Sequence, residues 1–200
     1  KGVKLSGAAS YKIDTGGPSA RAVLPGTYDG DIEEDQVFLV ATNVQPNRQS
    51  VAAQGYCAVD GIGEKIALDV LGPGVAPKLI ADLGTDNWNL RNFLEEGGFP
   101  AEVSASASER AAAYQNVVAV KCRRPLPPGR DVALVWGASI AGKDGRLAGR
   151  DQRFDFTVRK EFSARFECGR VNPQAGCNPV QPAYVRFTAP VPLSRAKAVR

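Results

Sequence analysis

The sequence predicts a mainly β protein, a β-sandwich with a small helical insertion over about residues 80–114. One observation supports this fold class, and a second indicates how the chain is organised into modules. Short segments rich in Val, Ile and aromatic residues are separated by clusters of Gly, Pro, Asp and Asn, which is typical of strands joined by turns. In addition, one stretch of sequence returns later in the chain, which is typical of tandem modules. Short strands at close intervals favour two packed sheets.

Seven segments are predicted to be strands because they combine β-branched or aromatic residues with flanking turn residues. The alternation of apolar and polar residues is cleanest from Phe154 to Val158, which indicates one buried and one solvated face. The predicted strands cover residues 11–15, 37–44, 66–71, 117–122, 132–136, 154–158 and 184–189.

Within the insertion the pattern changes from strand to helix. Thr85 or Asp86 is the predicted N-cap of a helix that ends at Gly97-Gly98. A second stretch, residues 104–113, is rich in Ala and Ser and is predicted to form another short helix. The apolar residues of the first helix are Trp88, Leu90, Phe93 and Leu94.

The repeat consists of ordered pairs of similar segments. Ser19-Ala20 returns as Ser163-Ala164, and residues 37–44 are answered by 184–191. The spacing drifts from pair to pair, as expected for modules with loop insertions. Two further pairs are Leu5-Ser6-Gly7 with Leu147-Ala148-Gly149, and residues 11–15 with 154–157.

The repeat also predicts the domain boundaries. Residues 17–158 form a complete module, residues 1–16 the closing strand of a preceding module, and residues 159–200 the opening strands of a following one. Entry and exit of a sandwich in a modular string are expected at opposite poles. The terminal pieces should therefore be splayed out or paired with a neighbour, with Val185 and Phe187 covered by residues of the longer protein.

The four cysteines predict two disulfides. The segment between Cys168 and Cys177 is rich in turn residues and suits a hairpin-like loop closed by a bridge. A second bridge between Cys57 and Cys122 would enclose the helical insertion. The chain has no His and no Cys-x-x-Cys spacing, which disfavours zinc. Paired cysteines point to an oxidising compartment, whereas buried free thiols are the alternative for either pair.

No catalytic, cofactor-binding or metal-binding residue is predicted. Without His the chain cannot supply a Ser-His or Cys-His couple, and no cysteine is placed as an activated thiolate. The net charge of +4 arises from 25 Lys and Arg against 21 Asp and Glu, and both signs are interspersed. This distribution argues against a nucleic-acid surface. No apolar run is long enough to span a membrane.

Three short motifs have ordinary structural interpretations. An acidic run lacks the ligand spacing of a calcium loop and is predicted to be a solvated turn that leads into a strand. Gly61-Ile62-Gly63 is too short for a phosphate-binding loop, and Arg123-Arg124 is predicted to be exposed in a turn. The acidic run comprises Asp29, Asp31, Glu33, Glu34 and Asp35.

The two tryptophans could form an aromatic platform for a sugar or could pack inside the fold. Trp136 lies in an apolar segment and is predicted to be a core residue. Trp88 is predicted to pack the inserted helix against the sandwich. Neither is therefore selected as a ligand-binding residue.

Ordered blocks along most of the chain carry a family resemblance. They are DIEEDQVFL at 31–39, YCAVDGIGE at 56–64, VWG at 135–137, FDFTVR at 154–159, FSARFEC at 162–168, CNPV at 177–180 and FTAPV at 187–191. Through these blocks the chain resembles the N-terminal part of large proteobacterial α2-macroglobulin-like proteins. The resemblance implies an immunoglobulin-like, macroglobulin-type β-sandwich.

The resemblance also implies a function. Members of this family are multi-domain protease inhibitors of the periplasm and cell envelope, in which cleavage of a bait segment makes the molecule collapse around the protease. Some members also tether the protease through a Cys-to-Gln thioester. The implied partners are target proteases, neighbouring macroglobulin domains and a peptidoglycan-building penicillin-binding protein. A membrane anchor in the full-length protein is left open.

The chain departs from the family at its reactive elements. None of the four cysteines begins a Cys-Gly/Leu-Glu-Gln thioester motif, and no bait segment is identified. The resemblance therefore implies a scaffold role with no enzyme activity and no cofactor. Two alternatives remain. One is a carbohydrate- or surface-binding module of an adhesin, which needs an exposed aromatic patch or an open edge strand. The other is an accessory module of an envelope enzyme.

Overall fold

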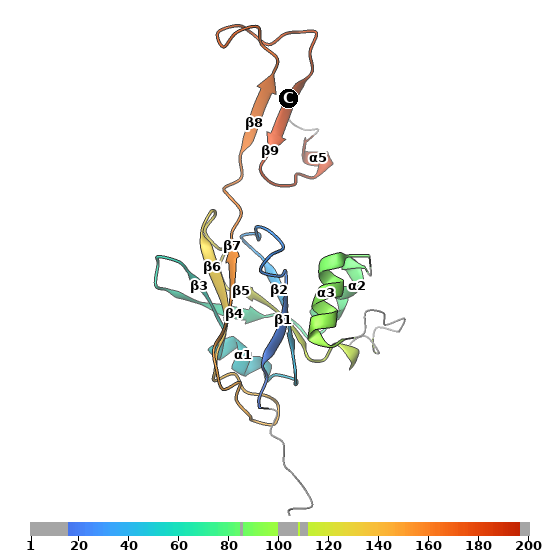
Figure 1. The fold of residues 1–200 in the computed structure, drawn as a ribbon, viewed down its shortest axis with the longest axis vertical. Coiled ribbons are helices and arrows are strands. Elements are labelled where there is room, and N and C mark those ends of the chain that lie inside the picture. The colour runs from blue at the N-terminus through green and yellow to red at the C-terminus, as the bar shows by residue number, and fades with distance from the viewer. Residues whose placement is uncertain (1–15, 85, 100–107, 109–111, 197–200) are drawn as a thin grey trace, which may run out of the picture.

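The computed structural model describes residues 16–84, 86–99, 108 and 112–196. In this part of the chain a seven-stranded antiparallel structure is followed by a separate hairpin (Figure 1), and the seven strands follow the order β1-β2-β5-β4-β3-β6-β7. The strands are β1 (Ala20–Leu24), β2 (Val37–Thr42), β3 (Tyr56–Val59), β4 (Lys65–Val70), β5 (Val117–Cys122), β6 (Asp131–Trp136), β7 (Gln152–Thr157), β8 (Ala164–Cys168) and β9 (Ala183–Phe187).

β4 divides the seven strands into two sheets. Its residues 65–67 pair with β3, whereas residues 68–70 pair with β5. One sheet therefore holds β1, β2, β5 and the second half of β4, and the other holds the first half of β4 with β3, β6 and β7. The prediction of a mainly β, immunoglobulin-like sandwich is confirmed.

The main core lies between the two sheets. Phe38 of β2 and Phe156 of β7 meet across it with ring centroids 5.0 Å apart. Trp136 is fully buried in the same core, and its indole Nε1 donates a hydrogen bond of 2.7 Å to the backbone oxygen of Pro18. Burial of these large side chains supplies the main favourable term in folding.

A disulfide joins the two sheets where β4 passes between them. Cys57 of β3 lies opposite Ile66, and Cys122 of β5 lies opposite Leu68, so that the two cysteines flank β4. Their Cα atoms are 6.0 Å apart, and both cysteines are buried. The predicted pairing of Cys57 with Cys122 is therefore found, and it links the two sheets through their shared core.

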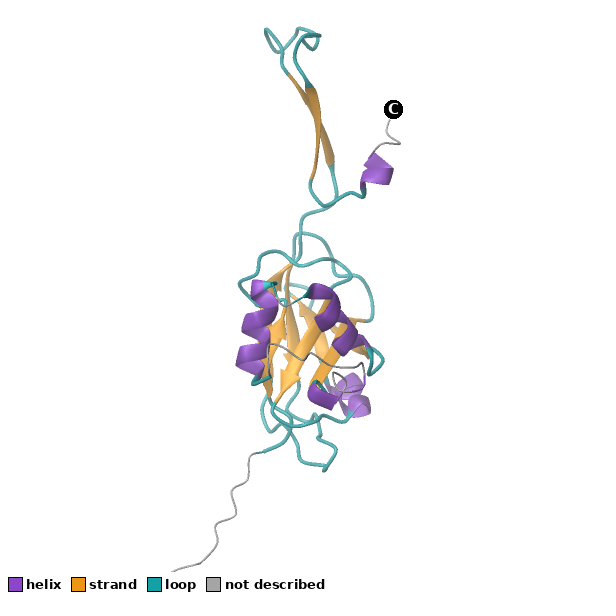
Figure 2. Cartoon of the chain, turned by 90° about the vertical axis from the view of Figure 1, so that its right-hand side faces the viewer, coloured by secondary structure: helices purple, strands orange, loops and turns teal. Residues whose placement is uncertain are grey.

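Helices cover the outer face of β1, β2 and β5 (Figure 2). They are α2 (Val75–Leu83) and α3 (Trp88–Gly97). The helical insertion thus begins at Val75 rather than near residue 80. A third helix, α1 (Arg48–Gln54), follows its N-cap Asn47 and contributes the buried Val51 to the main core.

The N-cap of α3 differs from the prediction. Asn87 caps the helix, and its side-chain Oδ1 accepts a hydrogen bond of 3.0 Å from the backbone N–H of Leu90. Asp86 does not cap it, and Thr85 lies outside the described residues. The predicted end at Gly97-Gly98 is confirmed, because Gly98 adopts the left-handed conformation with φ of 76° that often terminates helices.

The first and last strands of the sandwich lie beside each other without a backbone ladder between them. Successive antiparallel pairing from β1 to β7 makes these two strands parallel. They are joined at one end by the side chain of Gln152, and at the other end by the parallel bridge between Ile32 and Val158. The β-structure is therefore nearly closed, and the chain enters and leaves it at opposite poles (Figure 1).

The strands β8 and β9 form a hairpin that projects from the sandwich (Figures 1 and 2). The predicted disulfide between Cys168 and Cys177 is present, with Cα atoms 5.5 Å apart. A short helix, α5 (Leu193–Ala196), follows β9. The hairpin makes no strand pairing with the sandwich among the described residues.

Six of the predicted strands match observed strands to within two residues at each end, namely β2, β4, β5, β6, β7 and β9. The predicted strand 11–15 lies outside the described residues. Of the predicted helix 104–113, residues 104–107 and 109–111 also lie outside them, whereas residues 108, 112 and 113 are helical. The sequence did not predict β1, β3, β8, α1 or α2.

Candidate functional site

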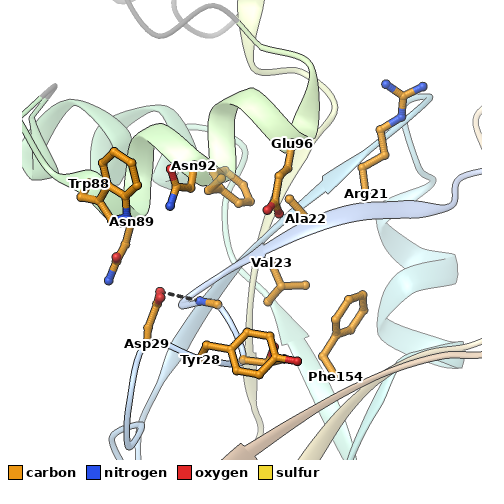
Figure 3. Close-up of a pocket in the computed structure, with 13 residues that line it drawn as sticks. Arg21, Ala22, Val23, Tyr28, Asp29, Trp88, Asn89, Asn92, Glu96 and Phe154 are labelled. Atoms are coloured by element: carbon orange, nitrogen blue, oxygen red, sulfur yellow. Dashed lines mark hydrogen bonds between the residues drawn. The ribbon is translucent and has the colours of Figure 1, made fainter.

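A cleft of about 620 Å³ opens between α3 and the loop that follows β1 (Figure 3). Its floor is formed by β1, and Phe154 of β7 lies at its lower edge. Its volume is in the range of about 300–1,000 Å³ that is typical of small-molecule sites. The lining residues are Arg21, Ala22, Val23, Gly26, Thr27, Tyr28, Asp29, Trp88, Asn89, Asn92, Phe93, Glu96 and Phe154.

One wall of this cleft is formed by polar residues on one face of α3. Leu90, Phe93 and Leu94 are buried on the face of α3 that packs against the sheet. Residues three and four positions apart share a helix face, so that Asn89, Asn92 and Glu96 form a separate row. Figure 3 shows this row along the upper side of the cleft.

The opposite wall is a turn closed by its own hydrogen bonds. Asp29 Oδ2 accepts a hydrogen bond of 2.7 Å from the backbone N–H of Gly26, and Asp29 N–H donates to the Gly26 oxygen at 3.1 Å. This turn holds Tyr28 with its side chain fully exposed. In Figure 3 Tyr28 and Asp29 lie across the cleft from Asn89, Asn92 and Glu96.

Trp88 stands at one end of the cleft. The sequence predicted that Trp88 packs the inserted helix, and this prediction is wrong, because 66% of the Trp88 surface is exposed. The buried residues of α3 lie farther along the helix. The guanidinium carbon of Arg91 lies 5.8 Å from its ring centroid. Trp136, in contrast, is the core residue that the sequence predicted.

The cleft is lined by polar and aromatic side chains. Its side chains offer amides that both donate and accept hydrogen bonds, carboxylates that accept them, and aromatic rings. Among the described residues no group of three or more His, Cys, Asp or Glu side chains is placed to hold a metal ion. Outside the cleft, partial burial lowers the pKa of the Arg48 guanidinium on α1.

The acidic run before β2 has structural roles. Glu33 and Glu34 both pair with Arg159, Glu34 through an Oε1 to Nη2 distance of 3.5 Å. The backbone N–H of Arg159 also donates to the Ile32 oxygen at 2.9 Å. These contacts fix the chain where it leaves the sandwich. Of the other carboxylates in the run, Asp29 closes the turn described above.

The remaining motifs also lie in turns. Gly61 and Gly63 both adopt positive φ angles in the connection between β3 and β4, which favours glycine. Arg123 and Arg124 are exposed beyond β5, where Arg123 pairs with Asp69 at 3.0 Å. Arg124 pairs with Glu64.

Comparisons with known proteins do not assign the chain to a family. No family model matches the chain, and no curated protein sequence matches it. The crystal structure of the N-terminal part of the bacterial S-layer protein SbsC is similar over 75% of this chain and 26% of that chain, with 14% identity and a TM-score of 0.37. The structure of the S-layer protein rSbsC(31-844) is similar over 84% and 24%, with 10% identity and a TM-score of 0.36. The chain thus spans about a quarter of each protein, and these similarities assign no function.

Within the described residues, no helix combines the length and the hydrophobicity needed to cross a bilayer.

Proposed function

We propose that this chain is a scaffold segment of an α2-macroglobulin-like protease inhibitor of the bacterial cell envelope. In this role the sandwich is one link in a string of similar modules, and residues 159–200 begin the next link. The observation that carries the proposal is the correspondence between the hairpin β8–β9 and the pair β1–β2.

The repeated segments fall on corresponding strands. Ser19-Ala20 leads into β1 and Ser163-Ala164 leads into β8, while the paired segments 37–44 and 184–191 contain β2 and most of β9. Both strand pairs are antiparallel. This correspondence supports the hairpin as the opening strands of a second sandwich.

The hairpin also has the two-faced pattern of sandwich strands. Phe166 pairs with Val185 on one face, and these side chains are 59% and 45% exposed. Side chains alternate between the faces of a strand, which puts Glu167 and Arg186 on the other face, where they form an ion pair of 2.8 Å. An incomplete sandwich presents a polar outer face and an apolar face that no second sheet covers. The apolar face would be covered by the following strands of the longer protein.

The proposed location is the periplasm or cell envelope, and the two disulfides are consistent with an oxidising compartment. The proposed partners are neighbouring macroglobulin modules, target proteases bound by the whole protein, and a peptidoglycan-building penicillin-binding protein. In this proposal the segment itself performs no catalysis.

Protease capture by the full-length gene product tests the proposal. Trypsin mixed with that protein should keep its activity on a small chromogenic peptide and lose its activity on casein, because a collapsed cage admits only small substrates. The 200-residue chain is the matched control and should leave both activities unchanged. Unchanged casein hydrolysis with excess full-length protein would refute the proposal, and so would inhibition by the 200-residue chain alone.

A further inference from the structure

We infer that the cleft between α3 and the 25–29 turn binds a neutral oligosaccharide. This inference does not depend on the scaffold role, because the side chains proposed to contact the ligand lie on α3 and in the turn after β1, outside the repeated segments. It rests on the exposed aromatic rings, the row of amides and the charge of the groups that face the cleft.

Two aromatic residues of the cleft, Trp88 and Tyr28, do not belong to the buried core. Trp88 is 66% exposed, and Tyr28 is fully exposed at the tip of its turn. Exposing such rings to water is unfavourable, and a pyranose ring can cover them with its apolar C–H face while its hydroxyl groups stay available for hydrogen bonds. The two rings come from opposite walls of the cleft.

The amides provide the polar half of such a site. Asn89 and Asn92 lie one helical turn apart on the face of α3 that lines the cleft. Each carboxamide offers donors and acceptors together, which matches a sugar hydroxyl that also does both. No hydrogen bond to another described residue occupies either side chain.

The charges of the cleft select against an anionic ligand. Glu96 and Asp29 lie on the two walls, whereas Arg21 extends away from the centre of the cleft (Figure 3). A phosphate or an acidic sugar would be repelled by the two carboxylates. A hydroxyl-rich neutral ligand avoids that repulsion and can donate hydrogen bonds to them.

An apolar peptide fits this surface less well. Ala22 and Val23 of the floor are already buried beneath the surface of the cleft, so that they offer little further apolar area to a peptide side chain. The exposed apolar surface is instead carried by flat rings at the rim. A ligand with flat apolar faces and polar edges therefore suits the site best.

Tryptophan fluorescence gives a direct test, because the chain has two tryptophans and only Trp88 is exposed. Maltohexaose, cellohexaose and hexa-N-acetylchitohexaose are the probes. At least one of them should shift the emission of the native chain and protect Trp88 from acrylamide quenching. Amide chemical shifts in α3 and in the 25–29 turn should move in the same titration.

Variants assign the binding to the cleft. Trp88→Ala and Asn92→Ala should each weaken binding of the active probe by at least about tenfold, while Trp88→Phe should retain most of it. Binding by the alanine variants is read from the chemical shifts. Phe162→Ala removes a half-exposed ring from the segment before β8 and should leave binding unchanged. Circular dichroism should show native folding of all four variants, because none of these side chains lies in the core.

Two results would overturn the inference. One is that none of the three oligosaccharides protects Trp88 or shifts the amides of α3. The other is that the cleft responds to a panel of unstructured peptides and to no oligosaccharide. Either result leaves the protease-capture experiment unaffected, so that failure of this site and failure of the scaffold proposal are distinguishable.

Discussion

The side-chain amide of Gln152 forms hydrogen bonds with both backbone polar groups of Ala20. Its Oε1 accepts from the Ala20 N–H at 2.7 Å, and its Nε2 donates to the Ala20 oxygen at 2.8 Å. A carboxamide carries the same donor and acceptor as a peptide unit. Gln152 therefore supplies one rung of hydrogen bonding between β7 and β1, which are not paired by their backbones. The hydroxyl of Ser19 adds a third hydrogen bond to Oε1 at 3.0 Å.

Gln152→Ala is expected to lower the free energy of unfolding by about 1–3 kcal/mol, because it leaves partly buried backbone groups of Ala20 without partners. Urea denaturation of residues 1–200 measures the change. Gln152→Glu keeps the shape and one acceptor but replaces the donor with a carboxylate oxygen that faces the Ala20 oxygen, so it should also destabilise the sandwich. Equal stability of the native chain and Gln152→Ala would show that this rung does not hold the strands together.

Gly137→Ala is expected to destabilise the sandwich. A Cβ at this position would lie 2.3 Å from the backbone oxygen of Gln54, so that α1 or β6 would have to move. Such overpacking typically costs about 1–3 kcal/mol. Thermal unfolding gives the measurement.

Gly74→Ala is the matched control for that change. Nothing lies within 4 Å of a Cβ at Gly74, and its φ of −80° suits any residue. Its effect should stay within about 0.5 kcal/mol. If both alanine variants melt at the same temperature, the close approach of the Gln54 oxygen to Gly137 does not affect the stability of the sandwich.

Removal of the two disulfides should have unequal effects. The double variant Cys57→Ala/Cys122→Ala opens a loop with a sequence separation of 65 and should lower the free energy of unfolding of the sandwich by about 4 kcal/mol. Cys168→Ala/Cys177→Ala should leave the unfolding of the sandwich unchanged, because that bridge lies in the projecting hairpin. It should instead speed hydrogen exchange in β8 and β9. A large loss of sandwich stability in the hairpin variant would contradict this separation.

Arg159→Ala should loosen the hairpin relative to the sandwich. The Arg159 side chain is only 20% exposed and pairs with Glu33 and Glu34 at the exit of the chain. Nuclear relaxation of β8 and β9 amides should report more independent motion in the variant. Arg159→Lys keeps the charge but loses the planar fork of donors, so an intermediate result is expected. Unchanged relaxation in Arg159→Ala would show that backbone contacts alone fix the exit.

The sequence could predict the strands whose own residues have a high strand preference. β5 reads Val-Val-Ala-Val-Lys-Cys, in which three of the first four residues are β-branched, and its predicted bounds match the structure. β1 reads Ala-Arg-Ala-Val-Leu, which has little intrinsic strand preference, and it is a strand because it pairs with β2 and lies beneath α3. α2 lacks a side-chain cap, and its buried residues Ala76 and Ile80 pack in the cluster that covers β1, β2 and β5.

The cleft could not be predicted in the same way. Its lining comes from residues 21–29, from α3 and from Phe154 of β7, which are far apart in the sequence. The exposure of Trp88 could not be predicted because it depends on the residue at which α3 begins. With the helix beginning at residue 88, the buried positions Leu90, Phe93 and Leu94 leave Trp88 on an exposed side of the first turn. An apolar residue near a helix start therefore did not identify a core residue.

The parallel arrangement of β1 and β7 has a mechanical consequence. Since the chain enters the sandwich at the start of β1 and leaves it at the end of β7, tension along the protein would pull these adjacent strands in opposite directions along their length. The hydrogen bonds of Gln152 to Ala20 and the bridge between Ile32 and Val158 would then be loaded together in shear, rather than opened one after another. Shear loading of this kind would let the sandwich bear tension between its two ends while it stays folded.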